Sequence, residues 1–571
     1  MKYVLPVLMM DFYKTGHIFQ YPRNTEVVYS TWTPRSNRYF PQADKVVSFG
    51  QQGFNQEWLI EFFNDNFFNK PIENVLHDYC RVIKNCLGID EPDSSHIEAL
   101  HDLGYLPIMI KSLPEGTLCP IRVPMLTIEN TIPEFFWLTN ALETLMSGEL
   151  WIPQTSATIA RHYRGIMEKW AMKTVGNVNF VPFQGHDFSM RGMEMNAGAI
   201  SGTGHLTSFV GTDTIPAVMR LEEYYGADIE KELVGCSVAA TEHSVMCAGG
   251  KDDELETYRR LIEEVYPTGI VSIVSDTWDF WNTLTNILPQ LKEKIMARDG
   301  KVVIRPDSGD PVDIICGNIR RTYKTLKNAV TEISEEHWEE AHEDCEGSHN
   351  MGCDEYATIA TIDGKSYEFI TPFEYNRHDK TYYYPDCSFT DRLGETTYKE
   401  IEVTPADKGT IELLWEVFGG TVNELGYKEL DSHIGAIYGD AITPERCEEI
   451  CRRLEAKGFA STNIVFGIGS FTYQYNTRDT FGFALKSTYV EVDGEARNIF
   501  KDPITDDGTK KSQTGMVGVV LDDKGDMVCV DGLSMEEEED LEGNLLETIF
   551  VNGIIMNRTT LSEIRTRLKE V

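Results

Sequence analysis

The sequence predicts an α/β protein in which an irregular barrel of alternating strands and helices is joined to an α+β domain and interrupted by an insertion. Three observations support this class. After residue 151, short β-branched runs alternate with helical segments, which is typical of parallel strands connected by helices. Residues 1–150 lack this regular alternation. A strongly acidic stretch, followed by an aromatic-rich one, then interrupts the alternation at about 325–420.

The N-terminal α+β domain is predicted to cover residues 1–150 and to be completed by the last part of the chain, from about 480 to 571. Its strands are indicated by β-branched runs, and its helices by apolar residues at helical spacing. Strands are expected at 27–32, 45–50, 106–111 and 125–129, and helices at 51–68, 133–150 and 559–569.

The barrel is predicted to occupy residues 151–479. A helix is expected at 157–173, and the short apolar runs that follow it are interpreted as strands, most of them separated by helices. These strands are expected at 179–183, 208–211, 270–275, 302–305, 434–438, 463–466 and 486–490. The stretch at about 325–420 is predicted to be an insertion with short strands of its own, and its charge run is typical of a solvated face.

The composition excludes some functions. The chain carries 91 acidic and 52 basic residues, a net charge of −39, which argues against binding nucleic acid through a broad basic face. No apolar stretch is long enough to cross a membrane, and the N-terminal apolar run lacks the cleavage site of a signal peptide. Twelve cysteines without a CxxC pair favour a reduced, cytoplasmic compartment.

The stretch KVVIRPDSGDP, residues 301–311, combines a short buried strand with charged residues at its end. Arg305 can bind an anion there, and Asp307 can hold sugar hydroxyls or a hard metal ion. Because the active sites of barrels lie at the carboxyl ends of their strands, this stretch is a candidate site. The alternative is a surface turn with a salt bridge.

Two other strands end in the same way. Asp276 follows the run 270–275, and Asp440 follows the run 434–438. Together with Asp307, these carboxylates can converge on one cavity and bind Mg²⁺ and ribose hydroxyls. A glycine loop in NIVFGIGSFT follows a late strand, where barrels often bind phosphate through backbone N–H groups. Its spacing is not that of a Walker motif.

Three further stretches carry candidate ligand-binding side chains. Phe188 beside Arg191 suits a flat ring carried next to an anion. Asp213 ends another strand and would select a ligand that donates hydrogen bonds, unless it only caps the following helix. His243, beside Glu242, is either a packed or capping histidine or a nucleophile that accepts phosphate.

A set of basic residues lies late in this acidic chain. Ordinary surface positions would explain such residues, but in a chain with a net charge of −39 they also suggest a pocket for a polyanion. The set consists of Arg478, Lys486, Lys501 and Lys510.

A series of phrases runs in one order through nearly the whole chain: DFYKTGHIFQYP, LPEGTL, ENTIPEFFWLTNALET, HDFSMRG, GTDT, EHS, VSDTWD, IRPDSGDP, YGDA, NIVFGIGS, TRDTFGFALKSTYV and FKDP. In these phrases the chain resembles the nicotinamide phosphoribosyltransferases, which are type II phosphoribosyltransferases. The resemblance implies a reaction of nicotinamide with 5-phosphoribosyl-1-pyrophosphate (PRPP) that gives nicotinamide mononucleotide and pyrophosphate. It also implies Mg²⁺, ATP as an activating co-substrate, and a homodimer with shared active sites.

The resemblance further implies a role for each matching residue. The catalytic residues would be His243, Asp276, Arg305 and Asp307. The nicotinamide pocket would be formed by Phe188, Arg191, Asp213, Arg305 and Tyr13 of the partner subunit. Ser237 would be a further substrate-binding residue. In this pocket the ring would stack between Phe188 and the partner's Tyr13, and Asp213 would hold the carboxamide.

The donor side of the reaction would use a larger set. Asp276 and Asp307 would face Mg²⁺, Asp307 and Asp440 would fix ribose hydroxyls, and His243 would be phosphorylated from ATP. The phosphates would lie against Gly439, Gly469, Ser470 and the partner subunit's Arg35, Arg478, Lys486, Lys501 and Lys510. Ser470 stands where the family has a glycine, so either the backbone would approach the phosphate more tightly or the Ser470 hydroxyl would replace an N–H contact.

Two alternatives stay open at this point. A nicotinate phosphoribosyltransferase would use the same chemistry, but its carboxylate substrate should avoid Asp213. A binding or regulatory protein on a retained enzyme scaffold would explain the large insertion, whereas the intact set of strand-end residues argues against it.

Overall fold

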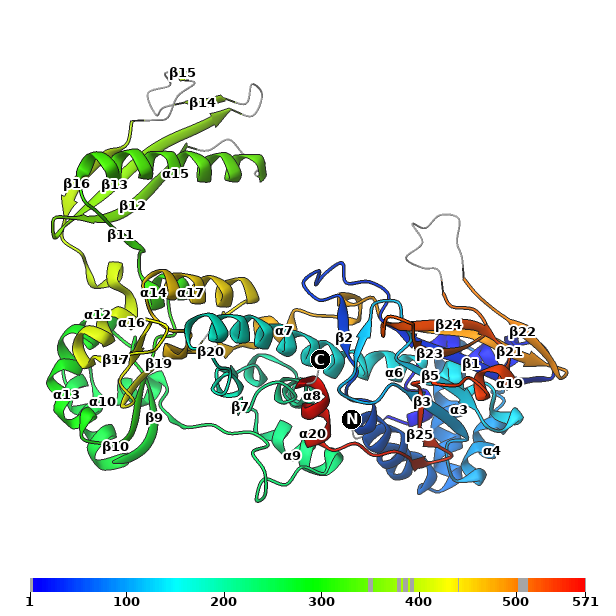
Figure 1. Cartoon of the computed structure of the whole chain (residues 1–571). Coiled ribbons are helices and arrows are strands. Elements are labelled where there is room, and N and C mark those ends of the chain that lie inside the picture. The colour runs from blue at the N-terminus through cyan, green and yellow to red at the C-terminus, as the bar shows by residue number, and fades with distance from the viewer. Residues whose placement is uncertain are drawn as a thin grey trace. The chain divides into compact units, whose positions relative to one another are not determined.

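The computed structural model describes residues 4–347, 353–376, 381–383, 389–390, 395–439, 441–501 and 512–569. Asp440 and Lys510, two of the predicted ligand-binding residues, lie outside the described residues. The chain forms two units, whose elements are labelled in Figure 1. Unit 1 consists of residues 1–165, 185–237 and 468–571, and unit 2 of residues 166–184 and 238–467.

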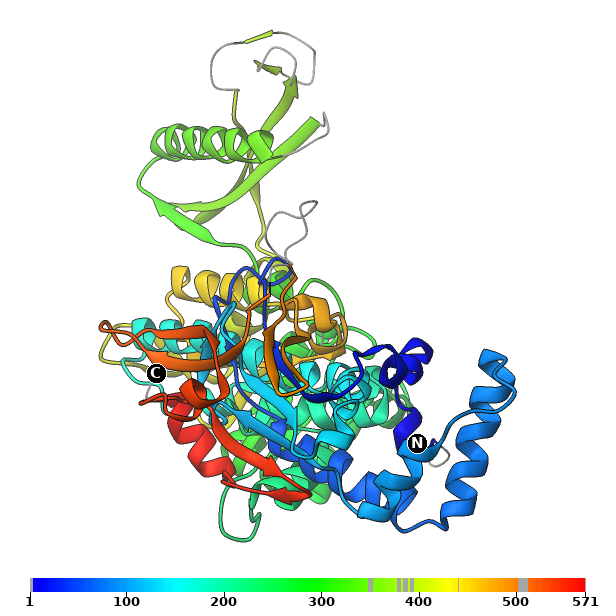
Figure 2. The ribbon, with the colours of Figure 1, turned by 90° about the vertical axis from the view of Figure 1, so that its right-hand side faces the viewer.

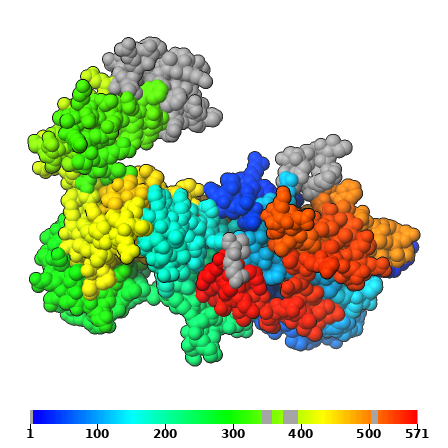
Figure 3. Space-filling view, in the orientation of Figure 1, coloured from blue at the N-terminus to red at the C-terminus, as the bar shows by residue number. Residues whose placement is uncertain are grey.

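Unit 1 is built on an antiparallel sheet to which both ends of the chain contribute strands. The strands lie in the order β22 (Glu495–Asn498), β21 (Ala484–Val492), β1 (Thr25–Thr33), β5 (Leu126–Asn130), β3 (Ile108–Ser112), β25 (Glu547–Val551) and β26 (Ile554–Ile555). In Figure 3 the orange and red surface of the C-terminal segment adjoins the blue and cyan surface of the N-terminal segment. Because β1 pairs with both β5 and β21, the first and last parts of the chain form one domain.

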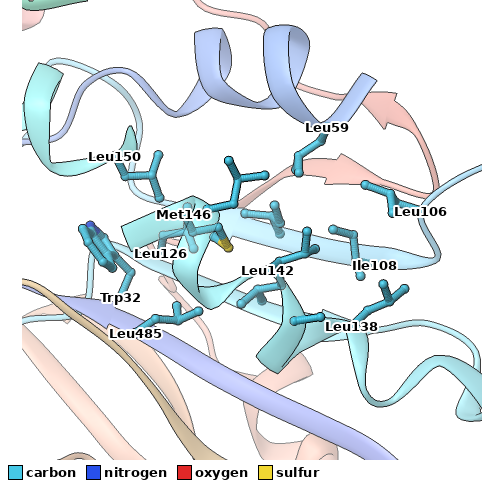
Figure 4. Packing of buried hydrophobic residues seen from close by; sticks show 14 of the residues in the cluster. Trp32, Leu59, Leu106, Ile108, Leu126, Leu138, Leu142, Met146, Leu150 and Leu485 are labelled. Atoms are coloured by element: carbon cyan, nitrogen blue, oxygen red, sulfur yellow. The ribbon is translucent and has the colours of Figure 1, made fainter. Parts of the chain in front are cut away.

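Short helices cover this sheet and close its core, part of which is shown in Figure 4. They are α2 (Gln51–Phe54) with the π-helical turns Asn55–Phe62 and Asn64–Phe68, α3 (Ile72–Leu87), α4 (Ser95–Leu103), α5 (Leu138–Ala141) and α6 (Glu143–Glu149). Trp32 of β1 is fully buried and stacks on Phe483, with ring centroids 5.1 Å apart. These contacts bury the apolar residues that the sequence places at helical spacing.

A second cluster of unit 1 joins residues that the sequence assigned to the barrel. Its strands β6 (Gly185–Asp187) and β7 (Gly211–Thr212) pair in parallel. The helices nearby are the first part of α7 (Trp151–Thr174), α8 (Met195–Leu206), α9 (Ile215–Tyr225), α18 (Ser470–Gln474) and α20 (Leu561–Lys569). Leu206, Leu221 and Leu561 share one buried cluster with Val47 and Phe49. For this reason the observed units differ from the expected boundaries at 150 and 479.

Unit 2 carries five parallel strands in the order β20 (Ile464–Ile468), β19 (Ile434–Tyr438), β10 (Asp299–Arg305), β9 (Thr268–Val274) and β8 (Ala239–Ala240). Its main helices are α10 (His243–Gly249), α11 (Glu254–Arg260), α13 (Leu288–Met296), α14 (Pro311–Cys316), α16 (Pro405–Phe418) and α17 (Pro444–Ala456). Parallel strands joined through helices place all strand ends of one kind at one edge of the sheet. That edge holds the residues that follow β9, β10 and β19.

The insertion has a sheet and a core of its own. Helix α15 (Leu326–Gly347) packs across β12 (Cys353–Ile362) and β13 (Lys365–Asn376), as Figures 1 and 2 show. The other strands are β11 (Arg320–Tyr323), β14 (Thr381–Tyr383), β15 (Phe389–Thr390) and β16 (Thr397–Ile401). The expected limits of 325 and 420 differ from the observed limits. Strand β11 precedes α15, and the apolar residues of α16 are buried outside the insertion core.

Most of the expected elements are confirmed. The strand expected at 179–183 is wrong, and the one expected at 208–211 overlaps the observed strand β7 only at Gly211. Residues 179–183 contain a 3₁₀ turn, Val181–Phe183, with Pro182 near its start, and the strand follows at β6. Proline has no N–H to donate to a strand ladder. Residues 486–490 do form a strand, but β21 is antiparallel to β1 and does not belong to the parallel sheet. Among the described residues, no helix has both the length and the apolar character that crossing a membrane requires.

A buried carboxyl group ties the start of α2 to the rest of unit 1. Glu115 Oε1 accepts the backbone N–H of Gln52 at 2.7 Å and lies 3.4 Å from the hydroxyl of Tyr225. Burial raises the pKa of Glu115 to about 7, although the backbone N–H groups at the helix start oppose the shift. In the unfolded chain the same group ionises near 4.5. The unfolded state therefore binds fewer protons between these values, and stability falls as pH rises from about 4.5 to about 7.

We predict that Glu115→Gln removes this dependence, because the amide oxygen still accepts a hydrogen bond but does not ionise. Thermal unfolding should give similar midpoints for variant and wild type near pH 5. By pH 8 the variant should be the more stable, with a gain on the order of 3 kcal/mol. Glu98→Gln, on the exposed side of α4, is the control. A difference between Glu115→Gln and wild type that stays constant across this pH range would contradict the assignment.

Candidate active site

The first candidate cluster lies at the ends of β6 and β7 in unit 1 and centres on Asp213. His186 Nε2 lies 3.0 Å from Asp213 Oδ1, and Ser237 Oγ donates to the same oxygen at 2.5 Å. The Asp213 side chain is 46% exposed, so it can still meet a ligand. A carboxylate only accepts hydrogen bonds, so this cluster suits a ligand that donates them.

The alternative that Asp213 caps the following helix is wrong. Helix α9 begins at Ile215, its N-cap is Thr214, and no side chain caps it. The backbone N–H of Asp213 instead donates to the carbonyl of Asp187 at 2.9 Å, which fixes the turn after β7. The Asp213 side chain is thereby directed to His186 and Ser237.

Phe188 completes the cluster with an aromatic face. Its ring centroid lies 4.7 Å from that of His186, with the planes at 42°. Its backbone N–H donates to the carbonyl of Ile468 at 2.9 Å. The ring contact with His186 fixes the Phe188 side chain, and the hydrogen bond to Ile468 fixes its backbone. The position of Phe188 is therefore well defined for stacking on a flat ligand.

Two residues that were not among the predicted site residues organise this cluster. Asp187, fully buried, accepts a hydrogen bond from the backbone N–H of Ser189 at 2.9 Å and one from the hydroxyl of Thr214 at 2.6 Å. His186 is the partner of Asp213. Both residues belong to the phrase GHDFSMRG. The signal that could have identified them is that they are polar residues at the end of a strand.

The glycine loop approaches the turn that carries Arg191. A Cβ atom added at Gly192 would lie 2.1 Å from Ser470 Oγ, so these two backbones can approach only because residue 192 is glycine. Gly469 is buried and directly precedes α18. Arg191 itself is exposed. The structure thus brings Arg191, Gly469 and Ser470 together.

The predicted cationic residues of unit 1 are held differently from one another. Lys486 lies 3.4 Å from Glu143, which also pairs with the buried Lys14. Burial lowers the pKa of Lys486. Arg35 Nε donates to the carbonyl of Gly482 at 2.9 Å. Arg478 and Lys501 are exposed, as is Tyr13, which is predicted to stack on the ligand ring.

The second candidate cluster lies at the ends of β9 and β10 in unit 2. Asp276 Oδ2 accepts the backbone N–H of Asp307 at 2.9 Å and the hydroxyl of Ser308 at 2.6 Å. His243 Nε2 lies 3.8 Å from Asp276 Oδ1 and 3.6 Å from Asp307 Oδ2. On its other side His243 Nδ1 lies 3.1 Å from the hydroxyl of Thr277. This histidine is neither buried nor a cap, because its side chain is 46% exposed and Glu242 holds the cap position.

Arg305 and Gly439 border the same cluster. Arg305 donates to the carbonyl of Thr241. A Cβ atom at Gly439 would lie 3.0 Å from Asp307 Oδ1 and 3.5 Å from Arg305 Cδ. The absence of a side chain therefore lets the backbone after β19 approach both residues. The strand ends of β8, β9, β10 and β19 all contribute to this cluster.

The two carboxylates can be tested as ligands for Mg²⁺. The Asp276 side chain is 4% exposed, and its Oδ1 atom has no hydrogen-bond partner. Asp307 is 36% exposed. Within the described ranges, no three side chains of His, Cys, Asp and Glu form a metal cluster. Mg²⁺ usually takes only one or two carboxylates together with water and substrate phosphates, so the pair fits this ion.

Comparisons with known proteins identify the family of the chain. The family model described as "Nicotinate phosphoribosyltransferase (NAPRTase) family" matches residues 183–342 and 366–554. The chain belongs to this family. A nicotinamide phosphoribosyltransferase of Acinetobacter baylyi is 45% identical over 99% of this chain and 97% of its own. One from Mycoplasma pneumoniae is 31% identical over 89% and 94%.

A solved structure shows the same fold at low identity. The nicotinate-nucleotide pyrophosphorylase of Pyrococcus furiosus aligns with 99% of this chain and 95% of its own, with a TM-score of 0.50 and 15% identity. The predicted class, an α/β fold of the type II phosphoribosyltransferases with an added α+β domain, is confirmed. The family resemblance seen in the sequence is confirmed with it.

A single arginine from the C-terminal helix supports the loops of the Asp213 cluster. Arg565 of α20 donates to the carbonyls of Leu206 at 2.9 Å, Leu233 at 2.7 Å and Val234 at 2.7 Å. Leu206 ends α8, and the other two residues lead to Ser237. Burial lowers the pKa of Arg565 to about 10, which still leaves the group charged at neutral pH.

We predict that Arg565→Ala destabilises the protein by about 2–4 kcal/mol, because it leaves several carbonyls of unit 1 without their charged donor. The measurement is the shift of the thermal and denaturant unfolding midpoints. Arg558→Ala is the matched control, because Arg558 makes an exposed contact with Gln56 from the same C-terminal segment. Equal shifts for the two variants would contradict the role of Arg565.

Proposed function

We propose that this protein transfers the 5-phosphoribosyl group of PRPP to nicotinamide, giving nicotinamide mononucleotide and pyrophosphate, a step in NAD biosynthesis. The observation that carries the proposal is the Asp213 carboxylate, held by His186 and Ser237 beside the ring of Phe188. The names of the relatives from Acinetobacter baylyi and Mycoplasma pneumoniae support it.

The same cluster favours nicotinamide over nicotinate. The amide of nicotinamide offers N–H groups to the Asp213 carboxylate, whereas the carboxylate of nicotinate would be repelled by it. Phe188 supplies one stacking face for the pyridine ring. The exposed Tyr13 of a partner subunit supplies the other in this proposal, so the active form is a homodimer.

On the donor side, Asp276 and Asp307 hold Mg²⁺, which supplies charge compensation for the departing pyrophosphate. Asp307 and Asp440 accept hydrogen bonds from the ribose hydroxyls. Carboxylates near the sugar also favour the positive charge that develops on it as pyrophosphate leaves. Attack by the ring nitrogen needs only alignment, so no covalent nucleophile toward the sugar is required.

The phosphates of PRPP bind to the glycine-rich backbone and to the cationic side chains. In this proposal Gly439 and Gly469 would face the 5′-phosphate through their backbones, and Ser470 would do so through its backbone or its hydroxyl. Arg191 and Arg305 would line the nicotinamide pocket. The cations that reach phosphates from the partner subunit are Arg35, Arg478, Lys486, Lys501 and Lys510. In a chain with a net charge of −39, such local cations are what an anionic substrate needs.

In this proposal ATP phosphorylates His243. Its Nε2 atom faces Asp276 and Asp307, and its Nδ1 atom lies beside Thr277. Transfer of the γ-phosphoryl group to a ring nitrogen forms a P–N bond and releases ADP, and hydrolysis of that bond drives the reaction toward nicotinamide mononucleotide. The twelve cysteines without a CxxC pair favour a cytoplasmic enzyme.

We predict that the protein forms nicotinamide mononucleotide from nicotinamide, PRPP and Mg²⁺, with kcat/KM at least about a hundredfold higher for nicotinamide than for nicotinate. Asp213→Asn should reduce this ratio by about tenfold or more, because an amide no longer repels the acid. Asp228→Asn is the control, because Asp228 is a half-buried carboxylate of unit 1 that pairs with Lys231. Chromatographic product assays measure both ratios. A wild-type preference for nicotinate would overturn the proposal.

We also predict that chelation of Mg²⁺ abolishes turnover and that Asp276→Asn lowers kcat/KM for PRPP by about a hundredfold or more. Asp299→Asn is the matched control, because Asp299 lies at the opposite end of β10 from Asp307 and is exposed. Calorimetry of Mg²⁺-pyrophosphate binding provides a readout that does not depend on turnover. Unchanged binding in Asp276→Asn would contradict its role as a metal ligand.

A further inference from the structure

A buried histidine of unit 1 has no part in the functions described so far. His205 of α8 is fully buried, and its Nδ1 atom lies 2.8 Å from the hydroxyl of Tyr473. Its Nε2 atom lies 3.0 Å from the carbonyl oxygen of Gly211. Tyr473 is 2% exposed. Both ring nitrogens thus have a hydrogen-bond partner. Tyr473 belongs to α18, and Gly211 belongs to β7.

The direction of these hydrogen bonds is fixed by chemistry. A carbonyl oxygen can only accept, so Nε2 of His205 carries the proton that it shares with Gly211. Burial lowers the pKa of His205 to about 4, so the ring is neutral at physiological pH. The unprotonated Nδ1 atom therefore accepts the hydroxyl proton of Tyr473. The chain of donors runs in one direction only, from Tyr473 through His205 to Gly211.

The two ends of this chain belong to the loops that handle the substrates. Gly211 begins β7 and stands two residues before Asp213. A Cβ atom at Gly211 would lie 2.8 Å from His186 Nδ1, so the strand start packs directly on the partner of Asp213. Tyr473 belongs to α18, which begins at Ser470 immediately after Gly469.

We propose that His205 and Tyr473 are positioning residues that hold the base-selecting turn at Gly211–Asp213 at a fixed distance from the phosphate loop at Gly469–Ser470. This inference rests on the proposed function of the two loops. β7 has only two residues and α18 only five, so a rigid internal link between them sets how accurately they present two parts of one reaction. A misplacement of about 1 Å at such a site is enough to reduce turnover strongly.

A second buried tyrosine provides a control that distinguishes this positioning role from ordinary packing. Tyr163 of α7 is fully buried, and its hydroxyl lies 3.1 Å from that of Thr472, also on α18. Removing either tyrosine hydroxyl therefore removes a hydrogen bond that involves α18. Of these two hydrogen bonds, the one from Tyr473 leads through His205 to Gly211.

The experiment compares Tyr473→Phe with Tyr163→Phe in the full-length enzyme. Tyr473→Phe should raise the KM values for nicotinamide and PRPP and lower kcat/KM about tenfold for each, whereas Tyr163→Phe should stay within about twofold of wild type. The thermal midpoints of the two variants should fall by similar amounts, because each loses one buried hydroxyl bond.

A double-mutant cycle tests the link itself. His205→Gln places an amide N–H near the position of Nε2, which can still donate to Gly211, but removes the acceptor for Tyr473. Adding Tyr473→Phe to His205→Gln should therefore cause no further loss of kcat/KM, whereas independent effects would multiply. Imidazole ¹⁵N shifts of the wild type should show a proton on Nε2 and none on Nδ1.

The outcomes are distinguishable. A wild-type protein that does not make nicotinamide mononucleotide would overturn the proposed function, and the inference with it. A wild type with that activity and a Tyr473→Phe variant with unchanged KM values would overturn the inference alone. The inference would also be overturned if Tyr163→Phe lost as much activity as Tyr473→Phe. It would be overturned as well if the losses of kcat/KM caused by His205→Gln and Tyr473→Phe multiplied in the double mutant.

Discussion

His186 and Ser237 both make hydrogen bonds to one oxygen of Asp213, and in the proposed function these bonds are the constraint on which base recognition depends. An ionised carboxylate accepts about four hydrogen bonds and donates none, so in this proposal Asp213 decides which pyridine the protein can hold. The buried Asp187 fixes the strand end, and Arg565 fixes the loops on either side. Much of unit 1 around β6 and β7 thus serves to keep one carboxylate in place.

The two units carry two different chemical tasks. The cluster in unit 1 combines a ring face with an acceptor, and the cluster in unit 2 combines carboxylates with a histidine and an arginine. Each cluster lies at the carboxyl ends of parallel strands, where side chains from neighbouring strands are brought to one edge. This arrangement explains why the chemistry can be selective for a neutral base and yet handle a polyanion in a very acidic chain.

The elements that the sequence predicted well are those with strong β-branched or helical patterns. The run 434–438 coincides with β19, and the strand that ends at Arg305 is β10. Residues 179–183 were assigned wrongly because their apolar content resembles a strand, whereas Pro182 favours a turn. The limits of the insertion differ because α16, which follows β16, buries its apolar face outside the insertion core, and local sequence does not reveal which core a helix joins. His205 and Tyr473 were invisible in the same way, since they are 268 residues apart.

The candidate site residues were predicted mainly from strand ends and from the family resemblance, and their roles in binding ligands stay predictions.

The most direct test of the central claim is calorimetric titration of the wild-type protein with nicotinamide and with 3-acetylpyridine, which keeps the ring and carbonyl but has no amide N–H. If Asp213 recognises the amide as a hydrogen-bond donor, nicotinamide should bind at least about tenfold more tightly. Equal dissociation constants would contradict the account.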